Sequence, residues 1–109
     1  MTPTAELLNV LARHQGRENG INAADLASVM NVPVRGLRLL ITALREQGHA
    51  VCGTPRTGYF VPTTPEELAQ SCEFLRRRAM RSLLLLSRMS NVSLPDLLGQ
   101  LRLTETEAQ

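Results

Sequence analysis

The stretch NAADLASVMNVPVRGLRLLITALREQG, residues Asn22–Gly48, contains two helical patterns separated by only three residues. Apolar residues recur at helical spacing on both sides of the break, and we expect these to face the core: Leu26, Val29, Met30, Leu37, Ile41 and Leu44. Asn31 readily adopts the left-handed conformation that ends a helix, and Pro33 suits the first turn of a new one. The stretch therefore predicts two helices that meet at a sharp turn.

Signals at the ends of both patterns set the lengths of these helices. Asn22 stands where a capping residue belongs, and Asp25 follows three positions later, close to a capping box. The helix after the turn is predicted from Pro33 to Gln47, with Gly48 as its C-terminal stop. Ala27 is small where the two helices would approach most closely, which favours steep, close packing of the pair.

The chain before this pair predicts one more helix, from about Pro3 to Gln15. Thr2 or Thr4 can cap this helix. Its buried stripe is formed by four aliphatic residues: Leu7, Leu8, Val10 and Leu11. A turn-rich loop, Gly16–Gly20, follows, and Ile21 has room for a strand of one or two residues at most.

The chain after the pair predicts a β-hairpin and then a long helix. Two strand-like segments, Ala50–Cys52 and Tyr59–Val61, enclose a turn at Gly53–Gly58. Thr64 precedes a proline and two glutamates, which is typical of a helix start, and the helical pattern lasts to about Met89.

The composition of the 109 residues is that of a soluble globular protein with one domain, or one domain plus an extension. Hydrophobic residues make up 43% and charged residues 20%, which argues against wholesale disorder. Aromatic residues make up only 3%, with no Trp, so the core must be built from aliphatic side chains. This composition favours helices.

Targeting and redox features point to a cytoplasmic protein. The N-terminus has too short an apolar run for a secretory signal, and the longest apolar run, Leu83–Leu86, has Arg81 and Arg88 beside it. Cys52 and Cys72 have neither metal-ligand spacing nor the pattern of a disulfide framework, so we expect both to be small buried hydrophobic residues.

The basic residues are all of one type. Twelve Arg and no Lys give the chain a formal net charge of +2. The guanidinium fork suits phosphate groups and guanine edges. A GC-rich genome would produce the same bias, so composition leaves both interpretations open.

The order helix, helix, short turn, helix, hairpin is that of a winged helix-turn-helix. The run ADLASVMNVPVRGLRLLITALREQGHAV resembles the winged-helix modules of biotin-operon-repressor-like and DeoR-like bacterial regulators, and it is similar to small phage-encoded winged-helix proteins. The matching residues are Ala27, Val32, Arg35, Leu37, Arg38, Ile41, Leu44, Gly48 and the pair Gly58-Tyr59. Pro33, Gly36 and Leu39 depart from the pattern. The resemblance implies a winged helix-turn-helix domain over residues 1–63, mainly α with a small β-hairpin.

In this arrangement, the N-terminal end of the helix after the turn would reach base edges in the major groove of double-stranded DNA. Val34 can touch a thymine methyl group, and Gly36 lets the backbone come close. Arg35 or Arg38 can bind a guanine through two hydrogen bonds. Leu39 does not suit this role and would contact the C-terminal helix or a partner.

Three further residues are candidate DNA contacts. Arg45 lies further along the helix and would be a phosphate contact or a solvated charge. Arg56, with Thr57 beside it, lies at the hairpin tip, where a basic side chain can enter a minor groove or hold a phosphate.

The C-terminal extension, residues 64–103, carries an apolar stripe near heptad spacing. This leucine stripe consists of Leu68, Cys72, Leu75, Ala79, Leu83 (or Ser82) and Leu86. It can pack against the winged domain, but its length favours a homodimer. Residues 91–93 break the helix, a short last helix is expected over residues 94–103, and residues 104–109 should fray. The arginines at 76–78 and 81 form a solvated face or contact phosphate.

No catalytic set is evident. His14 and His49 are isolated, and no motif places a nucleophile or carboxylate beside them. We therefore expect no enzymatic activity, no metal and no cofactor. The sequence predicts a small, dimeric, sequence-specific transcriptional regulator of bacterial or phage origin. The alternative is a winged-helix adaptor that joins a protein assembly through its leucine-rich tail and Leu39.

Overall fold

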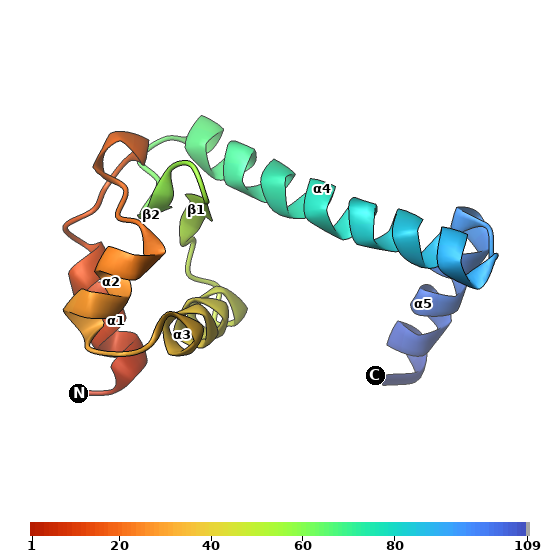
Figure 1. Ribbon diagram of the computed structural model, residues 1–109, viewed down its shortest axis with the longest axis horizontal. Coiled ribbons are helices and arrows are strands. Elements are labelled where there is room, and N and C mark those ends of the chain that lie inside the picture. The colour runs from red at the N-terminus through yellow and green to blue at the C-terminus, as the bar shows by residue number, and fades with distance from the viewer. Residues whose placement is uncertain (109) are drawn as a thin grey trace. The chain divides into compact units, whose positions relative to one another are not determined.

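The computed structural model describes residues 1–108, with side chains described as far as residue 102, and it is mainly helical with one small antiparallel hairpin (Figure 1). The elements in chain order are α1 (Pro3–Leu11), η1 (Arg17–Asn19), α2 (Ala23–Met30), α3 (Val34–Glu46), β1 (Cys52–Thr54), β2 (Gly58–Phe60), α4 (Pro65–Ser90) and α5 (Leu94–Ala108). The chain divides into two compact units, Met1–Cys72 and Glu73–Gln109, and the division falls within the continuous helix α4.

The core of the first unit is formed where α1, α2 and α3 converge. Six aliphatic side chains are almost completely buried there: Leu7, Leu11, Leu26, Leu37, Ile41 and Leu44. Each such side chain contributes roughly 1.5–3 kcal/mol on burial, so together they dominate the stability of this unit. Leu8 and Val10 pack against the core from its margin, as the stripe in α1 predicts.

The expectation that Val29 faces the core is wrong, because its side chain is 60% exposed. Ala27 is buried in its place, together with Leu26. Residue 29 lies about 200° around the helix from residue 27, so both cannot face the same core.

The turn between α2 and α3 forms as the sequence predicts. Asn31 adopts the left-handed conformation with φ 56° and ψ 45°, and the Val32 backbone N–H donates to the Ala27 carbonyl over 3.0 Å. Pro33 is the extended N-cap residue of α3, whose axis turns by 91° from that of α2. The Asn22 side chain caps α2 by accepting a hydrogen bond from the Asp25 N–H over 2.8 Å. The caps at both ends of α2 depend only on residues close in sequence, so the local sequence is enough to predict them.

Helix α1 ends at Leu11, four residues before the predicted end at Gln15. The segment after it pairs with backbone distant in sequence: the Val61 N–H donates to the His14 carbonyl, and the Gly16 N–H donates to the Val61 carbonyl, each over 2.8 Å. These strand-like bonds require extended backbone, so the helix cannot continue through them.

The hairpin is held on both sides of β2. On one side, β1 pairs with β2 in the register Cys52 to Phe60 and Thr54 to Gly58. On the other side, Tyr59 and Ile21 exchange two backbone hydrogen bonds of 2.7 and 2.9 Å, so Ile21 is the one-residue strand that the sequence predicts.

Gly58 sits at the tightest point of this sheet. Its φ is 73°, and a Cβ atom added there would lie 2.6 Å from the Ile21 carbonyl group. A glycine is therefore required at this position for both conformation and space.

The second unit consists of the remainder of α4 and α5. Asn91 is left-handed with φ 57°, which ends α4 at Ser90, one residue beyond the prediction. Ser93 caps α5, where Leu97 is 7% exposed. The helix extends beyond the predicted end at residue 103 to Ala108. Fraying of residues 104–109 concerns motion, and it stays a prediction.

No single helix in the described residues combines the length and the apolar composition needed to cross a membrane. Only α2 and α3 taken together reach those limits, and they are bent by 91° at the turn.

Candidate nucleic-acid interface

The outward face of α3 is the candidate site. With Leu37, Ile41 and Leu44 buried, the helical period leaves a set of exposed residues on the opposite side: Arg35, Arg38, Leu39, Thr42 and Glu46. No ion pair within the described part of the chain engages Arg35 or Arg38. Two guanidinium groups are thus presented near the N-terminal end of α3, where the helix dipole also favours an anion.

The two small residues at the start of α3 differ in their surroundings. Val34 is half-buried and packs against the core, so only part of its side chain can meet a ligand. Gly36 has no internal reason to be glycine, because an added Cβ atom would make ordinary contacts of 3.7 Å with the Pro33 ring and 3.8 Å with Val32. Its neighbours therefore do not require the absence of a side chain at this position.

Leu39 is the unusual residue on this face. Its side chain is 68% exposed, and it lies one helical turn beyond Arg35. It makes no contribution to the core, and its contact with the C-terminal helix or a partner stays a prediction.

Arg45 has a role inside the unit that sequence reasoning missed. Its Nε donates to the Val51 carbonyl over 2.9 Å, and the side chain is half-buried. This bond ties the end of α3 to the residue before β1. No local sequence signal reveals it, because Val51 is positioned by the fold of the intervening loop.

The hairpin tip presents one charged group. Arg56 is exposed, whereas the Thr57 hydroxyl is engaged within the turn: it accepts from the Thr54 N–H over 3.1 Å and donates to the Gly58 carbonyl over 3.0 Å. The Thr57 side chain therefore stabilises the turn, and Arg56 is the charged side chain at the tip that is exposed for contact with a partner.

The leucine stripe of α4 is mostly exposed. In the first unit Leu68 is 40% exposed, and Cys72 is exposed, contrary to the expectation that both cysteines are buried. In the second unit the exposed members are Leu75, Ala79 and Leu86, while Leu83 is half-buried. The exposed members form an apolar surface that a partner could cover, and their positions alone do not indicate which partner.

Cys52 behaves as expected for a small buried residue. Burial away from water raises the pKa of its thiol, although a hydrogen bond with Ser71 acts in the opposite direction. A raised pKa keeps the thiol protonated and unreactive at neutral pH.

Glu67 organises the junction between η1 and α4, a role that sequence reasoning did not assign. One carboxylate oxygen accepts from the Thr63 N–H over 2.8 Å, and the other accepts from the Arg17 N–H over 2.7 Å. Hydrogen bonds from the Thr63 and Arg17 backbone lower the pKa of Glu67. The Thr64-Pro65-Glu66-Glu67 pattern could have indicated the cap, but not the distant bond to Arg17.

Charge in the first unit is balanced overall. Residues 1–72 contain six Arg and six Asp or Glu, so any attraction to phosphate must come from local arrangement rather than net charge.

Comparisons of the chain with protein-family models, with curated proteins and with solved structures found no match.

Proposed function

We propose that this protein binds double-stranded DNA in a sequence-specific manner, as a winged helix-turn-helix regulator of the bacterial or phage type. The observation that carries the proposal is the 91° turn between α2 and α3, which braces α3 while its outer face presents Arg35 and Arg38. A helix held in this way can lie in a major groove with its N-terminal residues at the base edges.

The residues on this surface divide between base and backbone contacts. Arg35 and Arg38 are the candidates for guanine, each through two hydrogen bonds. Gly36 allows the helix to approach, and Arg56 at the hairpin tip contacts phosphate or enters a minor groove. Arg45 supports α3 through its bond to Val51. The proposed function involves no catalytic reaction and no cofactor.

A homodimer through the leucine stripe of α4 completes the proposal. One recognition helix reads only a few base pairs, whereas two copies related by a two-fold axis require two half-sites about one helical turn apart. The exposed leucines of α4 supply apolar surface for such an interface.

The test starts from duplexes selected out of a random pool by the full chain. Arg38→Ala and Arg35→Ala should each weaken binding to the selected duplex by about 1–3 kcal/mol, and at least one should relax the preference at one base pair. Arg13→Ala, the same change at an exposed position just after α1, is the matched control and should bind like the parent. If both α3 variants bind every duplex as tightly as the parent, the interface assigned to α3 is wrong.

A second candidate function is a protein–protein adaptor, favoured by the 68% exposure of Leu39. An apolar side chain of this size on an arginine-bearing face suits a protein surface. Salt separates the two functions, because DNA affinity falls steeply with salt as phosphates release counterions, whereas apolar contact does not.

A further inference from the structure

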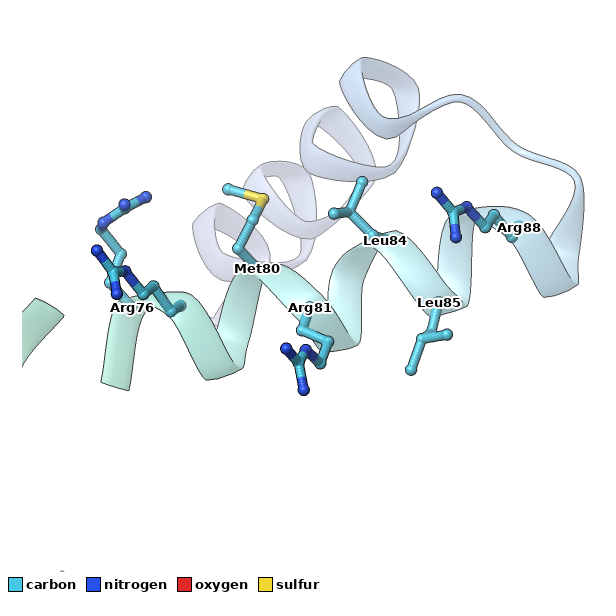
Figure 2. A pocket seen from close by; sticks show the side chains of 7 residues that line it. Arg76, Met80, Arg81, Leu84, Leu85 and Arg88 are labelled. Atoms are coloured by element: carbon cyan, nitrogen blue, oxygen red, sulfur yellow. The ribbon is translucent and has the colours of Figure 1, made fainter. Parts of the chain in front are cut away.

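A second basic surface lies on α4 within the second unit, and it goes beyond the DNA interface proposed for α3. Seven side chains of α4 line an open hollow of about 340 Å³. Figure 2 shows Met80 and Leu84 projecting from one side of the helix between Arg76 and Arg88, while Arg81 and Leu85 project from the adjoining side. The hollow therefore has apolar side chains and Arg81 in its middle part and further guanidinium groups at both ends.

The positive charge of this surface is only partly neutralised. Glu73 pairs with two arginines: it accepts from Arg76 over 2.7 Å and from Arg77 over 3.1 Å. The hydrogen bonds and charge of these arginines lower the pKa of Glu73 to about 2, with Arg76 as the main cause. Arg81 and Arg88 have no carboxylate partner among the side chains of residues 1–102, and no acidic residue occurs between them in the sequence.

We propose that this surface, the α4 groove, binds an acidic amphipathic helix of a partner protein. Leu84 and Leu85 are 40% and 53% exposed, so an occupant that covers them gains apolar burial. A helix with apolar residues every three or four positions would place them over Met80 and Leu84, with carboxylates against Arg81 and Arg88. Because the groove is positively charged, the partner helix is expected to carry acidic side chains.

The pattern of side chains favours a protein helix over other anionic partners. A nucleic-acid backbone offers phosphate to the arginines but no apolar surface to Leu84 and Leu85. A lipid surface suits a helix with a wide, continuous apolar face, whereas here arginines close both ends of a short apolar patch. An apolar centre with a polar rim is the usual anatomy of a protein interface.

The α4 groove is also separate from the leucine stripe. Its residues Arg77, Arg81 and Arg88 follow stripe positions 75, 79 and 86 by two residues, which is about 200° around the helix. The arginines of the groove therefore face away from a second copy on the stripe, whereas Met80 and Leu84 lie about 100° from stripe positions 79 and 83.

A charge-swap experiment on the full chain tests this proposal. The probes are two synthetic peptides about 18 residues, or five turns, long, with leucines at helical spacing and either Glu or Lys at the flanking positions. The parent should bind the Glu peptide at least about tenfold tighter than the Lys peptide, measured by fluorescence anisotropy. The double variant Arg81→Glu, Arg88→Glu should reverse that order, and reversal requires a folded groove.

Two controls and two competing surfaces complete the test. Arg78→Glu changes an arginine that stacks on Phe74, 5.7 Å from the ring centre and outside the groove, and it should keep the parent preference. Leu84→Ser should weaken binding of the Glu peptide without reversing the preference.

The proposal is overturned if the parent binds both peptides equally, or if Arg78→Glu acts like the double variant. It is also overturned if the double variant changes binding to anionic phospholipid vesicles or to duplex DNA but does not change binding to the peptides. The peptide readouts do not depend on DNA binding by α3, so they can fail or succeed independently of the proposed function.

Discussion

At the scale of single residues, Gly36 is the position where stability and the proposed function conflict. Glycine within a helix costs about 0.5–1 kcal/mol relative to alanine, and no neighbour of Gly36 requires its absence of a side chain. We propose that Gly36 serves the close approach of DNA to α3, which would offset its cost to the helix.

We predict that Gly36→Ala raises the free energy of unfolding by up to about 1 kcal/mol and weakens binding to the selected duplex. Thermal unfolding and a DNA titration measure the two effects. Gly99→Ala in α5, where an added Cβ atom meets nothing within 4 Å, is the matched control and should leave DNA binding unchanged. A Gly36→Ala variant that binds DNA like the parent would remove the functional explanation for this glycine.

Glu67 makes stability depend on pH in a defined direction. Because its pKa is lowered from the ordinary value of 4.5, the folded state favours the carboxylate. This contribution is fully present above pH 4.5 and is lost as the pH falls through the lower folded pKa. Glu67→Gln should therefore destabilise the protein at neutral pH, and the difference from the parent should shrink in acid.

Denaturant unfolding at neutral pH and at pH values below 4.5 measures that difference. Glu66→Gln, at the preceding position of α4, provides the control for loss of one charge. A gap between parent and Glu67→Gln that stays constant with pH would show that the ionised form of Glu67 is not what stabilises its bonds to Thr63 and Arg17.

At the scale of the elements, α4 contributes one buried hydroxyl to the sheet. The Gly53 N–H donates to the Ser71 Oγ over 3.2 Å, and Ser71 is 5% exposed. Ser71→Ala leaves that N–H buried without this acceptor, so we expect a loss of about 1–3 kcal/mol in the free energy of unfolding. Ser82→Ala, an exposed position of the same helix, should change it by less than about 0.5 kcal/mol. Urea unfolding of both variants gives the comparison.

The elements also show what the sequence can predict. The turn between α2 and α3, both of its caps and the start of α4 follow from residues within four positions of one another, so local chemistry predicts them. The early end of α1 depends on Val61, which is distant in sequence. The bond of Arg45 to Val51 likewise depends on the path of a loop. Periodicity identified the outer face of α3 but misassigned Val29, because a helix as short as α2 offers few positions to fix its inner face.

At the scale of the whole molecule, the predicted homodimer has a direct test. We expect the parent to sediment as a dimer at micromolar concentration. Ala79→Glu should yield a monomer, because a charge buried unpaired in the interface costs several kcal/mol. Glu retains good helix propensity, so the helix itself should survive. Leu83→Glu should give a monomer or an unfolded chain, since Leu83 is already half-buried within its own unit.

Arg81→Glu is the control for this prediction, because residue 81 lies about 200° around α4 from residue 79. It should leave the sedimentation of the parent unchanged. A parent that remains monomeric at high concentration would assign the leucine stripe to contacts within one chain.

The two-sided pairing of β2 has a consequence for how the molecule associates. Ile21 occupies one flank of β2 and β1 the other, while Ser71 takes the outward N–H of Gly53 at the outer edge of β1. Sheets aggregate when an edge strand offers a row of free N–H and C=O groups to another chain. Here the strands are three residues long and this outward donor is taken, so the sheet is a poor template for fibre growth. The predicted homodimer would therefore form through helical surfaces, where side chains rather than backbone determine which partner fits.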